Sequence, residues 1–146
     1  MLQIDLPKPI SVNGLFSNGA SGRVKTKRYR TWCDEAWVLI QSQKPFAPIS
    51  GPVRLLFAIG EVGVSPKADG DNMLKAYIDA LVTNGILPED NRTVIRGVGM
   101  EWVAGKEGAT AYIMPASGVA TAMEAPADNW RSIGDIAKDM VRGQIE

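Results

Sequence analysis

Two aspartates and a lysine stand at the start of an apolar, helix-like stretch, and these residue types can hold a metal ion beside a phosphate. Asp69 and Asp71 flank Gly70, and Lys75 follows Asp71 by one helical turn. A glycine between two carboxylates lets the backbone turn tightly, so both side chains can converge on one ion. Mg²⁺ prefers oxygen ligands, and a lysine one turn away is placed to meet a phosphate held by the ion. The stretch is therefore a candidate metal site.

A third acid, Asp90, lies in the turn after the same predicted helix. That helix is about fourteen residues, roughly 21 Å long, so the following loop must bring Asp90 back toward Asp71. A purely structural interpretation also exists. Asp69 or Asp71 can cap the helix, an Asp71–Lys75 pair is worth about 0.2–0.5 kcal/mol, and Asp90 is an ordinary turn residue. Two adjacent aspartates repel each other unless a cation lies between them, which favours the metal interpretation.

The composition excludes several kinds of catalytic site. The 146 residues include no histidine and one cysteine, Cys33, which excludes a Ser-His-Asp triad, a Cys-His pair and an HExxH zinc site. Sixteen basic and sixteen acidic residues cancel, but residues 1–31 carry six cations against one acid, and residues 115–146 carry five acids against three cations. Because there is no long apolar run, no signal peptide and no cysteine pair, we expect a cytoplasmic protein with no membrane association.

Hydrophobic periodicity predicts the elements that position these residues. Alternating or apolar runs indicate strands, and two apolar stripes at helical spacing indicate two main helices. The predicted segments are strands 2–7, 52–62, 93–103 and 109–115, helices 29–43, 71–85 and 129–142, a loop over 8–28 and a hairpin loop at 105–108. We expect a small α+β domain, with a mixed or antiparallel sheet of about four strands packed by two main helices, plus a C-terminal helical extension.

A basic segment precedes the first helix. It contains five cations and no acid: Arg23, Lys25, Lys27, Arg28 and Arg30. Such a loop can contact DNA phosphates without contacting the bases. The simpler interpretation is that these charged side chains are exposed only to solvent. Tyr29 can stack on an unpaired base or pack in the core, and its place in the helix stripe favours the core. The same stripe places Trp32 and Trp37 against the core or an interface.

Two motifs with their joint spacing resemble the RusA family of Holliday-junction resolvases. The first is "DGDNMLKAYIDAL", similar to the family's D-x-D-N-x-x-K-x-x-x-D-A-L helix start, and the second is the turn "GILPEDNRTV". The opening "LPKPISVN" resembles the family's L-P-x-P-x-S-x-N, with Asn13 at its Asn, so the likeness spans roughly residues 2–114. The motif residues are Asp69, Asp71, Asn72, Lys75, Asp79, Ala80, Leu81, Gly85, Glu89, Asp90 and Val94.

The resemblance implies a homodimeric endodeoxyribonuclease of phage or prophage type that requires Mg²⁺ or Mn²⁺. Members of the family resolve four-way DNA junctions by paired symmetrical nicks during recombination and repair. The resemblance assigns the essential metal-binding acids to Asp69, Asp71 and Asp90 and the essential lysine to Lys75, whereas we interpret Asp79 as structural. Residues 1–115 are then a RusA-like endonuclease domain, and residues 116–146 are a linker and a C-terminal helical extension.

The chain departs from the family pattern in two places. The basic run that often precedes the first aspartate is thinned to Lys67, which we add to the expected DNA contacts, and the segment 116–146 has no counterpart in compact members. These departures keep open a second interpretation, a catalytically inactive DNA- or protein-binding module that retains the RusA-like fold. A small-molecule phosphohydrolase is a third interpretation, but a small phosphate needs no extended basic surface.

Overall fold

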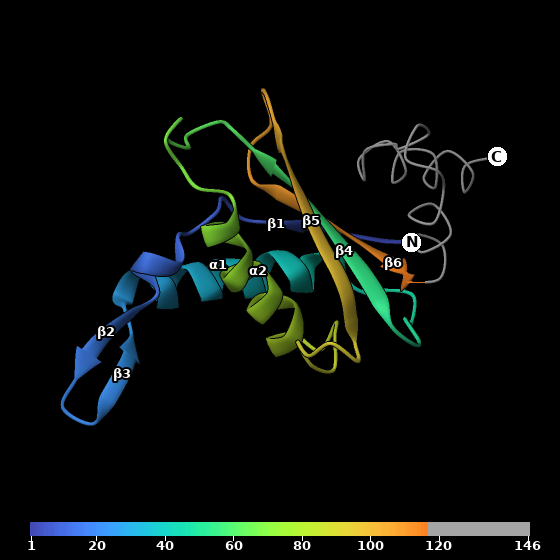
Figure 1. Ribbon diagram of the computed structural model, residues 1–146, viewed down its shortest axis with the longest axis horizontal. Coiled ribbons are helices and arrows are strands. Elements are labelled where there is room, and N and C mark those ends of the chain that lie inside the picture. The colour runs from blue at the N-terminus through green and yellow to red at the C-terminus, as the bar shows by residue number, and fades with distance from the viewer. Residues whose placement is uncertain (117–146) are drawn as a thin grey trace.

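Two helices pack on one face of a four-stranded mixed sheet, and a two-stranded hairpin projects from the body (Figure 1). The computed structural model describes residues 1–116, so the predicted helix at 129–142 lies outside the described residues. Within them, no helix is long and apolar enough to cross a membrane. The elements are β1 (Leu2–Leu6), the 3-10 helix η1 (Val12–Gly14), β2 (Phe16–Gly19), β3 (Gly22–Lys25), α1 (Lys27–Gln43), β4 (Val53–Gly60), α2 (Asp71–Thr83), β5 (Ile95–Val103) and β6 (Ala109–Pro115). The expected α+β class with two main helices is confirmed.

The strands are ordered β1-β6-β4-β5, with β6 antiparallel to both neighbours and β4 parallel to β5. The prediction of a hairpin loop at 105–108 is wrong, because β4 lies between the two strands that this loop joins. The loop crosses the end of β4, where Gly60 N–H donates to Gly108 O at 2.7 Å. A Cβ on Gly60 would lie 2.1 Å from Lys106 O, so this crossing requires a glycine.

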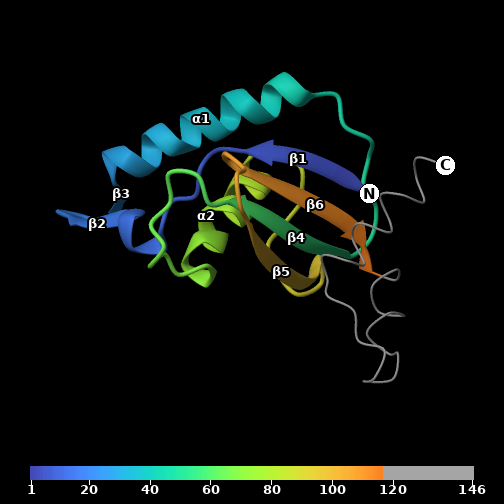
Figure 2. The same ribbon diagram turned by 90° about the horizontal axis from the view of Figure 1, so that it is seen from above.

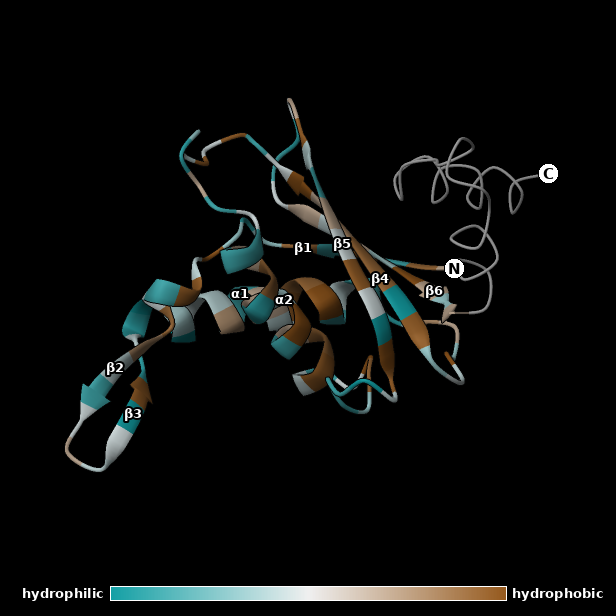
Figure 3. Cartoon of the chain, viewed as in Figure 1, coloured by the Kyte–Doolittle hydropathy of each residue, from teal (hydrophilic) through white to brown (hydrophobic). Residues whose placement is uncertain are grey.

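The core fills the space between the sheet and the two helices, where apolar residues gather (Figures 2 and 3). Five aromatic rings form a row through the core, and the centroids of neighbouring rings lie no more than 6.2 Å apart. This aromatic row is Phe16, Tyr29, Trp32, Tyr77 and Phe57. Trp32 Nε1–H donates to Lys8 O at 2.7 Å and Tyr77 O–H to Pro7 O at 2.8 Å, so the polar ends of both rings are satisfied.

Two expectations for α1 have different outcomes. The ring of Tyr29 is buried, which confirms the core interpretation and removes it as a surface for base stacking. Trp37 is 55% exposed, so of its two expected places the core is wrong, and an interface stays a prediction. The buried stripe of α1 follows the period of 3.6 through Tyr29, Trp32, Ala36 and Ile40, which places Trp37 off that line.

The segment 8–28, expected as a loop, contains the 3-10 helix η1 and the hairpin of β2 and β3. Ala20 and Ser21 form a two-residue turn between Gly19 and Gly22, and Gly22 has a φ of +120° that favours glycine. The hairpin lacks the apolar alternation of a half-buried strand because it packs on nothing over most of its length. Its polar composition therefore resembled that of a loop.

Candidate functional site

The Asp69-Gly70-Asp71 turn is held against β5 at the start of α2. Gly70 precedes the helix as its N-cap residue and has no side-chain capping bond, so the expectation that Asp69 or Asp71 caps the helix is wrong. A Cβ on Gly70 would lie 2.3 Å from Met100 Sδ and 3.5 Å from Trp102 Nε1. The glycine thus permits the turn to lie on the strand, and the side chains of both aspartates remain exposed.

The two aspartates perturb each other although Asp69 is fully exposed. A hydrogen bond with Asp71 and, second, the negative charge of Asp71 raise the pKa of Asp69 above its usual value. The two side chains therefore interact, and the presence of Asp71 disfavours the charged form of Asp69. The N-terminal end of α2, which carries partial positive charge, adjoins this pair. A divalent cation bound by both carboxylates would offset the repulsion between their charges.

Lys75 is paired with a different aspartate from the one that the sequence suggested. Its Nζ donates to Asp79 Oδ1 at 2.9 Å, one turn toward the C-terminal end of α2, and the pair with Asp71 is not formed. The Lys75 side chain is 50% exposed and that of Asp79 is 28% exposed. The ion pair is weak at this exposure, so Lys75 remains available to an incoming phosphate.

Asp90 lies elsewhere in this chain. It lines a cleft of about 500 Å³, and the α2 residues of that cleft begin at Asp79 and continue toward the C-terminal end of the helix. Residues 1–116 contain no group of three or more Asp, Glu or Cys side chains that lie close enough together to hold one metal ion. Of the predicted acidic triad, Asp69 and Asp71 are therefore neighbours in the structure. Asp90 of the same chain does not lie with them.

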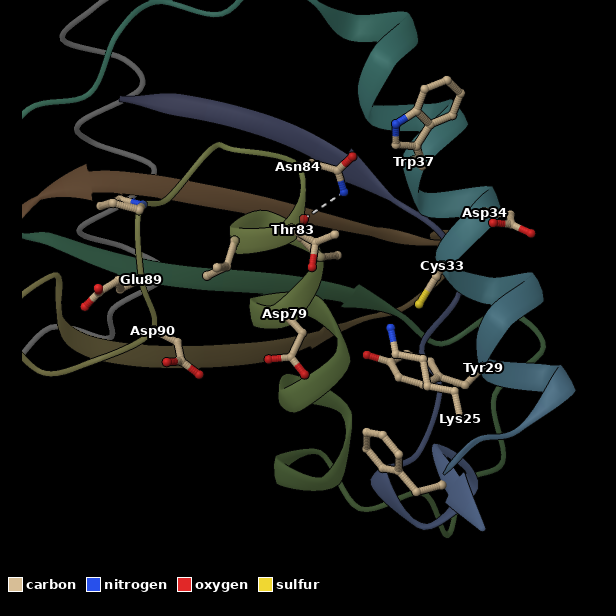
Figure 4. A pocket seen from close by; sticks show the side chains of 14 residues that line it. Lys25, Tyr29, Cys33, Asp34, Trp37, Asp79, Thr83, Asn84, Glu89 and Asp90 are labelled. Carbon is tan, nitrogen blue, oxygen red and sulfur yellow. Dashed lines mark hydrogen bonds between the residues drawn. The ribbon is translucent and has the colours of Figure 1, made fainter. Parts of the chain in front are cut away.

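The cleft itself was missed in the sequence, because it forms where α1, α2, the hairpin and the loop after α2 meet (Figure 4). Asp79 and Asp90 face it from one side, and Tyr29, Cys33 and Trp37 from the other. Burial, with smaller contributions from the charges of Cys33 and Asp79, raises the pKa of Tyr29. The helical spacing of Asp79 and Thr83 was the available signal, but spacing alone does not reveal that α1 lies opposite.

One buried polar atom adjoins this cleft. Asn84 Nδ2–H donates to Ala80 O at 2.8 Å, which closes the C-terminal end of α2, while Asn84 Oδ1 is buried without a hydrogen-bond partner in the described part of the chain. A buried amide oxygen of this kind costs about 1–3 kcal/mol when it stays unpaired.

The predicted DNA-contacting cations are exposed. Lys67 is in the loop before α2, two residues from Asp69, and the other five cations occupy β3 and the first turn of α1. Arg23 Cζ lies 5.0 Å from the ring centroid of Phe16, and Lys25 Nζ lies 5.2 Å from that of Tyr29. These contacts orient both cations over the first two rings of the aromatic row.

The sequence matches no protein-family model and, at significant similarity, no curated protein. The resemblance to the RusA family therefore rests on the motif residues and their spacing.

Proposed function

We propose that this protein is a Mg²⁺-dependent, structure-selective DNA endonuclease that resolves four-way junctions by paired symmetrical nicks. The observation that carries the proposal is the Asp69–Asp71 pair, two exposed aspartates at the start of α2 whose interaction raises the pKa of Asp69. A site that concentrates negative charge in this way is suited to a hard divalent cation. The RusA-like motifs and the absence of histidine from the chain support the same chemistry.

Each residue has a defined task in this proposal. Mg²⁺ or Mn²⁺, if bound at the site, would supply an activated water and would neutralise phosphate charge. Asp69 and Asp71 hold the ion, and Asp90 provides a further carboxylate. Lys75 leaves Asp79, which costs little at this exposure, and stabilises the charge that develops on the scissile phosphate.

A homodimer completes the proposal in two respects. A four-way junction has two opposed strands that must both be nicked, and a two-fold axis places one site on each. The dimer also offers a second source of Asp90, because Asp90 lies in a different group of side chains from Asp69 and Asp71 within one chain. We propose that Asp90 of one copy completes the pair on the other copy.

The test uses the full chain and a synthetic four-way junction with a mobile core. With Mg²⁺ the wild type should give paired nicks at symmetrical positions, mapped on denaturing gels. Asp71→Asn should bind the junction without cutting it. Glu107→Gln, which removes a different exposed carboxylate, is the matched control and should cut normally. Absence of nicks in both Mg²⁺ and Mn²⁺, with intact junction binding, would exclude the nuclease.

A second candidate is a catalytically inactive DNA-binding module with the same fold. The observation that favours it is the separation of Asp90 from the aspartate pair, together with the engagement of Lys75 by Asp79. This candidate requires junction affinity that is indifferent to Mg²⁺ and no cleaved product at any protein concentration. Divalent-dependent nicking by the wild type that is lost in Asp71→Asn would exclude it.

A further inference from the structure

We propose that the β2–β3 hairpin enters the major groove of a duplex DNA arm, where Asn18 and Arg23 contact base edges and confer sequence preference. The inference rests on the proposed function in one respect, that DNA is the ligand. It goes beyond that function because a metal site and a basic surface cut or bind DNA without reading its sequence.

The shape of the hairpin fits a groove. β2 and β3 project from the body beyond the end of α1 (Figure 1), and every residue from Ser17 to Lys25 is exposed. The tip is narrow because the two-residue turn Ala20–Ser21 is flanked by glycines on both strands. The major groove of B-DNA is about 12 Å wide and admits a two-stranded β-ribbon as well as an α-helix.

The side chains sort onto two different faces. Asn18 is directly opposite Arg23, and Phe16 is opposite Lys25, so these four residues share one face of the ribbon. Ser17 and Val24 are opposite each other on the reverse face, where Val24 is 45% exposed. One face therefore carries an amide and a guanidinium side by side near the tip, with an ammonium nearer the root. Asn pairs with adenine and Arg with guanine through two hydrogen bonds each in the major groove.

Arg23 is held ready for such a contact. Its guanidinium lies over the Phe16 ring, with Cζ 5.0 Å from the centroid. A guanidinium that rests on an aromatic face keeps its N–H donors free around its edge, and it loses less freedom when those donors bind. Residues 6–33 contain no acidic residue, so no carboxylate near in the sequence can pair with the N–H donors of Arg23.

The root of the hairpin is fixed to the body. Thr26 Oγ1–H donates to Gly14 O at 2.6 Å, and Thr26 N–H donates to Leu15 O at 3.0 Å. Thr26 also caps α1 by accepting from Tyr29 N–H at 3.1 Å, which joins the hairpin directly to the helix. Phe16 and Tyr29 pack edge to face with centroids 5.8 Å apart. A ribbon anchored in this way can present Asn18 and Arg23 in a fixed register.

The first turn of α1 supplies contacts to the groove walls. Lys27, Arg28 and Arg30 are exposed there, and this turn contains no acid to offset the partial positive charge of the helix end. Cations gathered at a helix N-terminus repel that end of the helix, and a phosphate relieves the repulsion. These residues therefore position the duplex while the ribbon tip lies in the groove.

The experiment measures binding alone, in EDTA, so that cleavage plays no part. Wild type, Asn18→Ala, Arg23→Ala and Lys25→Ala are equilibrated with duplexes of randomised sequence, and the bound fraction is sequenced. Arg23→Ala should weaken binding of the preferred sequence about 5- to 150-fold, which corresponds to about 1–3 kcal/mol for one two-bond base contact, and should barely change binding of other sequences. Asn18→Ala should erase preference at a neighbouring position.

Two substitutions serve as controls. Lys25→Ala should weaken binding to all sequences alike and lower the slope of affinity against salt by about one phosphate contact. Lys44→Ala, an exposed lysine at the opposite end of α1, should change neither quantity. Circular dichroism melts establish that each variant is folded.

The outcomes separate this inference from the nuclease proposal. Equal loss of affinity for all sequences in Arg23→Ala, or a wild type without sequence preference, would overturn the inference even if junctions are nicked. A changed base preference in Asn18→Ala and Arg23→Ala supports it even if no condition yields nicks, in which case the nuclease proposal alone fails.

Discussion

Lys75 donates to Asp79 across 2.9 Å, so the ammonium that the sequence placed beside Asp71 is engaged one turn further along α2. Lys followed by Asp is the less favourable order for an i,i+4 pair, and both side chains are accessible to water. The contact is therefore worth no more than about 0.2–0.5 kcal/mol. Lys75 can exchange this partner for a phosphate without any change in the backbone.

This relationship predicts opposite behaviour for two substitutions. Asp79→Asn should leave nicking intact and change the free energy of unfolding by less than about 0.5 kcal/mol, because it releases an exposed lysine. Lys75→Met should lower the nicking rate at least about 100-fold, the usual cost of losing a group that stabilises transition-state charge. Single-turnover cleavage and denaturant unfolding measure these effects. Loss of nicking in Asp79→Asn as large as in Lys75→Met would show instead that the ion pair is required.

The raised pKa of Asp69 predicts how stability depends on pH. Between pH 3.8, the pKa in the unfolded chain, and the higher pKa in the folded chain, the folded chain retains more of the proton on this carboxyl than the unfolded chain does. The associated stability is therefore complete below pH 3.8 and declines as the pH rises through the folded pKa. Asp71→Asn alters the hydrogen-bond partner and removes the negative charge that together raise this pKa.

Urea unfolding from pH 3 to pH 7 tests this difference. The free energy of unfolding of Asp71→Asn should decline less with rising pH than that of the wild type. Mg²⁺ should have a related effect, lowering the pKa of Asp69 in a ¹³C carboxyl titration. Identical pH profiles for the two proteins would show that the carboxyl groups act independently.

The separation of Asp90 from the aspartate pair predicts complementation between inactive subunits. In a mixed dimer of Asp71→Asn and Asp90→Asn chains, one site contains both substitutions and the other contains none if Asp90 comes from the partner. Mixing the inactive homodimers, with time for subunit exchange, should therefore restore a single nick per junction. If each site uses carboxylates from one chain, both sites stay defective and the mixture remains inactive.

The close approach of Gly70 to Met100 predicts that substitutions at these two positions have coupled effects on stability. Gly70→Ala places a methyl group within 2.3 Å of the Met100 sulfur, although the φ of −62° suits alanine. Because the clash is with the flexible end of Met100, the substitution should lower the free energy of unfolding by about 1 kcal/mol or less, and it should weaken divalent binding by displacing Asp69 and Asp71. Met100→Ala in the same chain should recover part of both losses in a double-mutant cycle, whereas strictly additive effects would contradict the contact.

The elements of the fold were largely readable from the sequence. Apolar alternation and helical spacing predicted β4, β5, β6 and both helices within about two residues, because each contributes apolar residues to the core. The neighbours of each strand were not readable, since periodicity carries no information about pairing, and β5 and β6 were therefore expected to form a hairpin. The β2–β3 hairpin was not predicted for a different reason. Its strands have no buried face, so their sequence shows no alternation of apolar and polar residues.

The candidate site was readable only where its residues are close in sequence. Asp69 and Asp71 interact because only one glycine separates them at the start of a helix. The place of Asp90 depends on how the loop after α2 turns, which no local spacing determines. The partner of Lys75 was equally undetermined, because Asp71 and Asp79 lie one turn away on either side of it along the same helix face.

The interior position of β6 has a consequence for how the chain folds. β6 is the last strand in residues 1–116, yet it lies between β1 and β4 and is the only strand that pairs with β1 there, joining Leu2 to Ile113. Closing a loop of that length costs about 4 kcal/mol of chain entropy by logarithmic scaling. β1 is synthesised early but cannot join the sheet until β6 arrives. We therefore expect slow, strongly cooperative folding in which the N-terminal strand is fixed late.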